Sequence, residues 1–293
     1  MSTFRDQVEP PAGQTVYLSW MLHREQLRPI AYDGLERIGA MADGGYVVDG
    51  RLIDSATAVL SLGLGYEWTF DEAVRGRNPS AVIIGVDPTI QPGKFVGMLI
   101  RSILKVPMYG LIGQRKALGR HLRYGRVARQ YFRLFRGSIR HIQKMVSAVD
   151  GPNDISLPTL IGMLGAVPNL GLVVKMDIEG SEYEVIPSIC EHAHLVSTLT
   201  AEFHDLTTKP ERFNQGIERL LEHFRIVHIH GNNYAPYSKE LDFPDVVEIT
   251  FIHRDLCPPS CQPSSKRYPD ALLDVPNDPE KEDYELRFSA DEI

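Results

Sequence analysis

Acidic and basic side chains gather where two apolar runs of the chain end. The run 171–176 leads into Asp177 and Glu179, and a second run ends just before His204. Carboxylates and imidazoles accept protons in general acid–base catalysis, and two carboxylates with an imidazole can also bind Mg²⁺ or Mn²⁺. We therefore predict Asp177 or His204 as the general base, with Glu179 and Lys175 orienting neighbouring groups. Asp177, Glu179 and His204 also form a candidate metal-ligand set.

The acids that follow position 176 could also cap the N-terminus of a helix instead of taking part in catalysis. Asp177, Glu179 and Glu182 stand within six residues, and the helix dipole stabilises carboxylates near a helix N-terminus. For Glu182 we favour capping or solvent exposure, whereas Asp177 and Glu179 lie nearer the strand end, where open α/β sheets bind ligands. The segment HIHGNNY also has two possible roles. Its histidines can lie in the core beside an Asn turn, or its side chains can line the pocket that binds a substrate. The residues concerned are His228, His230, Asn232 and Asn233.

The stretch SLGLGYEWTFDEAV carries two glycines directly after the apolar run 58–62. Glycines at such a place let the backbone pass close to a ligand that a side chain would exclude. A dinucleotide-binding motif has a third glycine at the position that Trp68 occupies here. The presence of Trp68 therefore weakens the hypothesis of an NAD-dependent oxidoreductase. S-adenosylmethionine has no phosphate to cradle, and its sulfonium and ammonium groups favour acidic neighbours. We therefore assign Gly63, Gly65 and Glu67 to a site for this methyl donor.

Two further motifs complete the predicted donor site. Asp87 ends the next β-branched run, 22 residues after Gly65, where it can accept hydrogen bonds from both ribose hydroxyls. The motif DGGY, which contains Gly44 and Tyr46, is expected to close over the amino-acid end of the donor. Structural alternatives stay open for both motifs, namely a helix cap for Asp87 and a plain turn for the glycines.

Short β-branched runs alternate with helix-like segments along the chain, which predicts an α/β fold with a doubly wound, mostly parallel sheet. Between the last strands, residues 211–224 place Ile217, Leu220, Leu221 and Phe224 on one stripe of a helix. The predicted strands are 58–62, 82–86, 171–176, 198–203, 226–230 and 246–252.

The composition is that of a globular protein without a disulfide framework. Of 293 residues, 43% are hydrophobic and 24% charged, which excludes the disordered and membrane-spanning classes. The first residues contain acids and no long apolar core, so we expect no secretory signal and a cytoplasmic protein. Three cysteines are too few for a zinc site built from two ligand pairs, and we expect reduced thiols.

Charge is divided unevenly along the chain. Residues 88–149 contain 13 Lys and Arg and no Asp or Glu, so this segment carries +13 while the remainder carries −20. Apolar residues at helical spacing accompany the charges and predict basic amphipathic helices. These helices either pack on their own domain with solvated arginines, or present residues 94–144 to anionic lipid headgroups or a phosphorylated substrate. Nucleic acid is a weaker alternative, because no nucleic-acid motif accompanies the charge.

Five motifs together resemble the FkbM-type and related domains of the class I S-adenosylmethionine-dependent methyltransferases. They are DGGYVVDG, SLGLGYEWTFDE, GVDPT, VVKMDIEGSEYEVI and TAEFHDL. The resemblance implies a seven-stranded sheet in the order 3-2-1-4-5-7-6, in which residues 246–252 form the antiparallel strand. Ser61 and Glu67 depart from the family pattern, since an acid is common at the first position and a third glycine at the second.

The resemblance also sets the expected domain limits. Residues 38–256 form the methyltransferase domain, with 88–149 as a basic helical insert. A helical or irregular segment covers 1–37, and a partly ordered tail rich in Pro and acids covers 257–293.

Two functions from different classes follow. The first is an S-adenosylmethionine-dependent methyltransferase, with or without a divalent metal, that methylates a hydroxyl of a sugar, a glycolipid or another small or lipid-linked acceptor. The enzyme would be cytoplasmic, with peripheral membrane contact through residues 94–144. The second is a non-catalytic domain that keeps the fold and docks on a membrane or protein through its basic helices.

Overall fold

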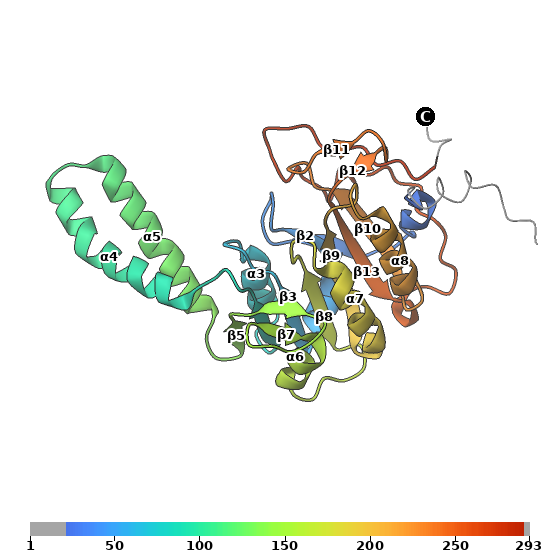
Figure 1. Ribbon diagram of the computed structural model, residues 1–293, viewed down its shortest axis with the longest axis horizontal. Helices are drawn as coiled ribbons and strands as arrows, with labels where there is room; N and C mark the ends of the chain where they lie inside the picture. The colour runs from blue at the N-terminus through green and yellow to red at the C-terminus, as the bar shows by residue number, and fades with distance from the viewer. Residues whose placement is uncertain (1–21, 290–293) are drawn as a thin grey trace, which may run out of the picture.

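A seven-stranded sheet forms the centre of the structure, a computed structural model that describes residues 22–289. The strand order is β5-β4-β3-β8-β9-β13-β10, and only β13 is antiparallel to its neighbours. This is the order that the resemblance implies, so the predicted doubly wound fold of class I methyltransferases is confirmed (Figure 1). The strands are β3 Ala58–Leu62, β4 Val82–Val86, β5 Ile139–Ile142, β8 Leu172–Met176, β9 Val196–Phe203, β10 Phe224–Gly231 and β13 Val247–His253.

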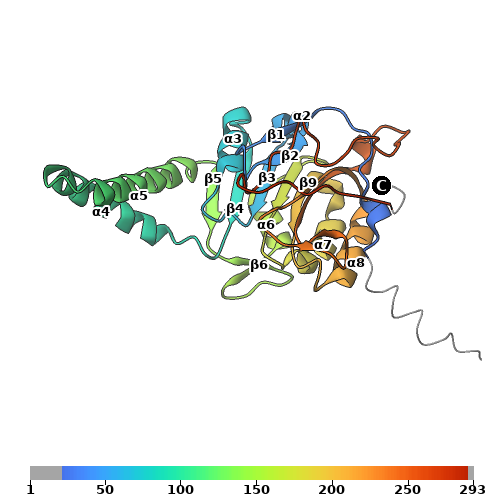
Figure 2. The same cartoon turned by 90° about the horizontal axis from the view of Figure 1, so that it is seen from above.

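The central strands are buried on both faces, and alternate residues join two different cores. Leu60 and Leu62 of β3 pack in a cluster with side chains of α6, α7 and α8, whereas Val59 packs with α2 and α3 on the opposite face. This period-two alternation explains why the strands read as continuous apolar runs in the sequence. Figure 2 shows the two helix layers on either side of the sheet. The helices are α2 Gly50–Ser55, α3 Thr69–Arg77, α6 Leu157–Leu164, α7 Glu182–Glu191 and α8 Pro210–Leu221.

Smaller elements surround the sheet. Strands β1 and β2 form an antiparallel hairpin before α2, and two further short pairs are β6–β7 and β11–β12. Their bounds are β1 Leu35–Ile38, β2 Tyr46–Asp49, β6 Met145–Ser147, β7 Asp154–Ser156, β11 Tyr237–Ser238 and β12 Phe243–Pro244; short 3₁₀ helices cover Arg24–Leu27, Ala193–Leu195 and Arg254–Leu256.

Two predictions about local structure need correction. Residues 88–149 are not helical throughout, because Ile139–Ile142 form edge strand β5 and Met145–Ser147 form β6. The predicted helix 211–224 begins at Pro210 and ends at Leu221. Phe224 instead starts β10, where its ring is fully buried.

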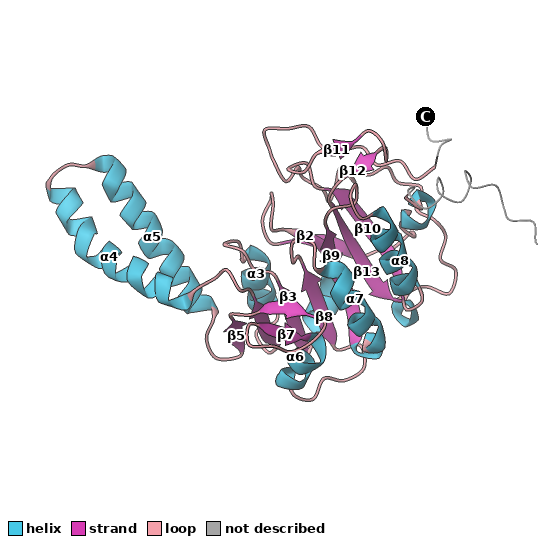
Figure 3. Cartoon of the chain, in the orientation of Figure 1, coloured by secondary structure: helices cyan, strands magenta, loops and turns pink. Residues whose placement is uncertain are grey.

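The helices that the basic segment does contain form an arm that projects from the sheet edge (Figures 1 and 3). The arm consists of α4, Pro92–Leu111, and α5, Arg115–Leu134. Its root is fixed by an aromatic cluster in which Trp68 contacts Phe95 and Tyr131, each at 6.0 Å between ring centroids. Trp68, which occupies the position of a third glycine in a dinucleotide turn, therefore anchors the arm to the body.

The segment that follows β13 is fastened to the body over its described length, 257–289. His228 and His230 of β10 are buried and bond to Asp274 and Asp283 of this segment, at 3.1 and 2.9 Å. The composition, from which we expect a partly ordered tail, does not reveal such distant pairs. Within residues 22–289 no helix has the length and apolarity needed to cross a bilayer. Residues 1–21 of the predicted N-terminal segment lie outside the described residues.

Candidate active site

The topological switch point of the sheet lies between β3 and β8. From β3 the chain continues outward to β4 and β5, whereas from β8 it continues to β9 on the other side. The last residues of β3, β4 and β8 are in register, because Leu62 pairs with both Val86 and Met176. Open α/β sheets bind ligands in the crevice outside the strand ends at such a point. The residues that follow these strands are Gly63, Asp87 and Asp177.

Two glycines shape the turn after β3. Gly63 has φ +78°, and a Cβ built there would lie 1.6 Å from the carbonyl oxygen of Asp177, so no other residue fits without a backbone shift. Gly65 has φ +54°, but its Cβ position meets no atom closer than 4.0 Å. The first glycine therefore lets two loops touch, and the second leaves an open stretch of backbone at the switch point.

Asp87 holds this turn in place. One carboxylate oxygen accepts from the backbone amides of Leu64 and Gly65, at 3.0 and 2.7 Å. The other accepts from the amide and hydroxyl of Thr89, both at 2.6 Å, and from the amide of Ile90 at 3.2 Å. Burial alone would raise the pKa of Asp87, but these hydrogen bonds lower it below 3.8. The acceptor capacity of the carboxylate is filled by the protein, so the predicted bonds to ribose would have to displace some of these donors.

The β1–β2 hairpin brings the remaining predicted donor residues to the same place. A Cβ on Gly44, whose φ is +84°, would lie 2.3 Å from Cγ of Glu67. The buried hydroxyl of Tyr46 donates to Oδ2 of Asp177 at 3.2 Å. Burial, together with the charge of Asp177, raises the pKa of Tyr46 well above its usual value, so this hydroxyl stays protonated. The six residues predicted for donor binding thus surround one region at the ends of β3 and β8.

Lys175 links Asp177 to the turn at Gly63. Its amino group is buried, donates to the carbonyl oxygen of Gly63 and lies 3.3 Å from Oδ2 of Asp177. It also lies 5.3 Å from the centroid of the Tyr46 ring. Lys175 and Tyr46 therefore fix Oδ2 of Asp177, while Oδ1 lies 4.0 Å from Nε2 of His204; both residues line the same cavity.

His204 lies among carboxylates. Its Nδ1 is 3.1 Å from Glu182, and its Nε2 is 3.2 Å from Glu202 and 3.6 Å from Glu179. Burial alone would lower the pKa of His204, but the hydrogen bonds to Glu182 and Glu202 raise it to about 11. The imidazole is therefore protonated near neutral pH and lacks the free nitrogen that a general base needs. Of the two predicted bases, the geometry favours Asp177.

Glu182 closes the loop that carries Asp177 and Glu179. It is fully buried, and its Oε1 accepts from the amides of Ile178 and Gly180, both at 3.1 Å. The alternative of a solvated Glu182 is therefore wrong. The same oxygen bonds to the imidazole of His204, which follows β9. This bond connects the loop after β8 to the end of β9.

A cavity of about 480 Å³ opens above these residues; we call it the acidic cavity. Its volume falls within the range of small-molecule sites. Burial, with the charges of Asp177 and Glu248, raises the pKa of Glu202 above its ordinary range. Burial also raises the pKa of Asp43. The lining is Asp43, Asp177, Glu179, Glu202, His204, Asn232, Tyr234, Ala235 and Val246.

Two residues next to the acidic cavity, Glu248 and Asn277, were not predicted from the sequence. Glu248 on β13 lies directly opposite Glu202 in the antiparallel register, and both side chains are buried. Asn277 of the C-terminal segment donates to Glu248 at 2.7 Å and lies 3.4 Å from Asp43. A usable signal was the acid inside the otherwise apolar run VVEITFIH, since a carboxylate inside a strand is rarely buried without a partner.

The described residues offer two candidate metal-ligand groups, and all of their members except Glu248 line this cavity. Asp177, Glu179 and His204, the set proposed from the sequence, have ligand atoms within 4.8 Å of one another. Asp43, Glu202 and Glu248 form the second such group. Oxygen and imidazole donors of this kind suit Mg²⁺ or Mn²⁺.

The HIHGNNY segment divides between two roles. Asn232 lines the acidic cavity and donates to Glu202 at 3.2 Å. Asn233 is fully buried and bonds to the C-terminal segment, accepting from the amide of Asp278 at 2.7 Å. Because His228 and His230 also bond to that segment, only Asn232 of the four reaches the acidic cavity.

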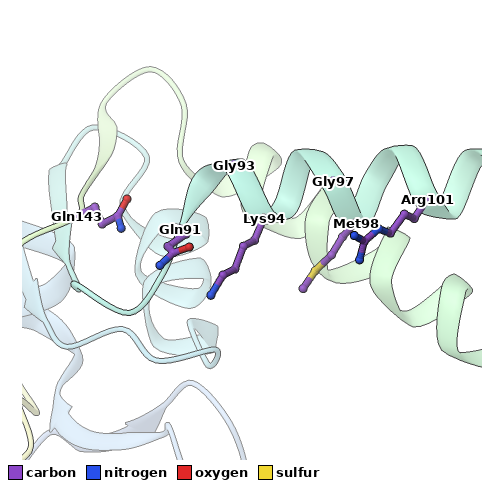
Figure 4. Close-up of a pocket in the computed structure, with 7 residues that line it drawn as sticks. All are labelled: Gln91, Gly93, Lys94, Gly97, Met98, Arg101 and Gln143. Carbon is purple, nitrogen blue, oxygen red and sulfur yellow. The ribbon is translucent and has the colours of Figure 1, made fainter.

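A second cavity, of about 700 Å³, lies at the root of the arm (Figure 4). Gln91 precedes α4 and Gln143 follows β5, while Lys94, Met98 and Arg101 line it from one side of α4. Among residues 22–289, no carboxylate lines this cavity. Its charge is therefore opposite to that of the acidic cavity.

No protein-family model and no curated protein matches this chain. Solved structures do match. One is a fibrillarin pre-rRNA processing protein of Methanococcus jannaschii, at 13% identity over 69% of this chain and 68% of that one, with a TM-score of 0.37. A predicted O-methyltransferase from Agrobacterium tumefaciens matches at 13% identity over 71% and 81% of the two chains, with a TM-score of 0.33.

A probable spermidine synthase from Corynebacterium glutamicum matches at 9% identity over 76% and 75% of the two chains, with a TM-score of 0.36. Identities and scores at this level transfer neither an activity nor a substrate.

Proposed function

We propose that this chain is an S-adenosylmethionine-dependent methyltransferase that methylates a hydroxyl group. The observation that carries the proposal is the contact between the turn at Gly63 and the loop at Asp177, at the switch point of a sheet with the methyltransferase strand order. This contact places a backbone that can admit a ligand beside a carboxylate that can accept a proton.

The charges at the strand ends suit this donor. Its sulfonium and ammonium groups are cationic, and the crevice offers Glu67, Asp43 and Asp177. A dinucleotide would bring a pyrophosphate to the same edge, where these carboxylates would repel it. The open backbone at Gly65 leaves room for a ligand, while Asp87 contributes mainly by holding the turn.

Methyl transfer needs orientation more than acid–base chemistry. The acceptor oxygen must lie in line behind the methyl group, and alignment of this kind is worth up to about 7–11 kcal/mol in ideal intramolecular reactions. Asp177 is placed to take the hydroxyl proton on Oδ1, because Tyr46 and Lys175 hold Oδ2. General-base help of this type contributes roughly 10²–10⁴-fold in rate.

The charges of the acidic cavity limit the chemical class of acceptor that can bind there. Asp177 and Glu179 line it beside Asp43 and Glu202, whose raised pKa values favour their neutral forms, so a phosphate or carboxylate on the acceptor would be repelled chiefly by Asp177 and Glu179. A neutral sugar hydroxyl, free or lipid-linked, or an acceptor with an amino group suits these charges. Asp177, Glu179 and His204 would hold a divalent cation if one binds, which would lower the pKa of a coordinated hydroxyl.

Donor binding is tested by replacing the glycine that leaves the backbone open. Gly65→Val puts a branched side chain into that space, and we expect the affinity for S-adenosylmethionine in titration calorimetry to fall at least about tenfold. Gly113→Val is the matched control, because Gly113 also has a positive φ and open space but lies at the tip of the arm. Equal loss in both variants, or no heat with the wild-type protein, would contradict the proposed donor site and favour the non-catalytic alternative.

Proton removal is tested by Asp177→Asn, which keeps the shape of the side chain. We expect transfer of labelled methyl groups to acceptors in a small-molecule extract to fall about a hundredfold or more, with donor binding retained. Asp205→Asn is the control, since its carboxylate bonds to Lys209 at 2.7 Å instead of lining the acidic cavity. Unchanged turnover in Asp177→Asn rejects this carboxylate as the base.

Metal binding should depend steeply on pH. Because the pKa of His204 is raised to about 11, a cation must displace a proton from Nε2 at any pH below that value. We expect the affinity for Mn²⁺ in calorimetry to strengthen about tenfold for each unit of rising pH near neutrality, and to be lost in His204→Gln. A pH-independent affinity, or binding that survives His204→Gln, excludes this ligand set.

A further inference from the structure

One face of α4 is apolar, and no other described part of the chain covers it. Its side chains follow helical spacing, so they form a single stripe along the arm. Their exposed fractions run from 43% to 89%, whereas side chains of this type are normally buried. We call this face the apolar stripe; its members are Val96, Ile100, Ile103, Leu104, Met108, Leu111 and Ile112.

Both helices of the arm carry exposed cations. Residues 88–149 contain no acid, and among the described residues the Lys and Arg side chains of α4 form no ion pair. Arg133, near the root, is 3.4 Å from Glu72 of the body. The exposed Lys and Arg residues of the two helices are Lys94, Arg101, Lys105, Arg115, Lys116, Arg120, Arg123, Arg126, Arg129 and Arg133.

The arm holds its shape without the stripe. A Cβ on Gly125 would lie 2.2 Å from Oγ of Ser102, so the two helices approach closely at small residues. Beyond this point the rings of Tyr109 and His121 stack at 5.4 Å between centroids. These contacts use the inner faces of the helices, and the arm carries the stripe away from the body (Figures 1 and 2).

We infer that the arm docks on an anionic membrane surface, with the apolar stripe entering the headgroup boundary and the flanking cations contacting lipid phosphates. A basic amphipathic helix binds such surfaces through buried apolar area together with attraction to anionic lipids. Each Lys or Arg near an anionic bilayer adds to the attraction, which falls off within a Debye length.

Other occupants fit the same surface less well. A nucleic acid would engage the cations but leave seven aliphatic side chains uncovered. A second copy that pairs arm to arm would bring two segments of +13 together, and like charges oppose that contact. An anionic bilayer is the partner that supplies both negative charge and an apolar layer.

Docking would also set the position of the acceptor. The arm leaves the body directly after β4, at the sheet edge where Gly65 and Asp177 lie. A lipid-linked acceptor would then meet the site from the membrane side. The docking itself does not depend on the proposed methyl transfer, because the arm and the acidic cavity share no lining residue.

Co-sedimentation of the full chain with lipid vesicles tests the inference. We expect binding to vesicles of phosphatidylcholine with phosphatidylserine, at least about tenfold weaker binding to phosphatidylcholine alone, and weakening by salt. The double variant Leu111→Ser/Ile112→Ser should bind the mixed vesicles at least about tenfold more weakly. Leu272→Ser is the matched control, because this leucine is 90% exposed but lies outside the arm. It should leave vesicle binding unchanged.

Arg120→Gln/Arg123→Gln should also weaken binding to the mixed vesicles, because both cations are exposed on α5. All replaced residues are exposed, so circular dichroism should show unchanged folding. No binding of the wild-type chain to either vesicle overturns the inference. Equal binding of the wild type and Leu111→Ser/Ile112→Ser overturns it as well, as does binding to duplex RNA with none to vesicles.

Discussion

The close approach of two loops at the ends of β3 and β8 is the constraint on which the candidate site depends. Gly63 allows the contact because a Cβ there would overlap the carbonyl oxygen of Asp177. Asp87 then fixes the turn, because one of its carboxylate oxygens accepts from the amides of Leu64 and Gly65 while the other accepts from the amide of Thr89. Since each buried donor that loses its partner costs about 1–3 kcal/mol, the turn has little freedom to move. Every residue assigned to the donor and to proton removal is positioned relative to this contact.

The molecule separates its charges in space. The acidic cavity lies above the strand ends, whereas the arm carries the cations and a root cavity lined by Lys94 and Arg101. Such a division suits an enzyme that is attracted to an anionic surface but accepts a neutral or cationic group at its catalytic carboxylate.

Local patterns predicted much of the fold. The bounds of β3 and β4 followed from their apolar runs, because both faces of a central parallel strand are buried. Strand β5 was missed because Ile139–Ile142 is short and carries Arg140 and His141 within a segment dominated by helical spacing. The predicted site residues at the ends of β3, β4 and β8 meet because parallel strands end at one edge. The contribution of Glu248 and Asn277 depends on β13 and the C-terminal segment folding back, which no local pattern encodes.

A crystal structure of the chain with bound S-adenosylhomocysteine tests the central claim most directly. We expect density for the ligand along Gly65, with its amino-acid end beside Glu67 and its sulfur facing Asp177. Density at another place, or an empty turn at a saturating ligand concentration, would contradict it.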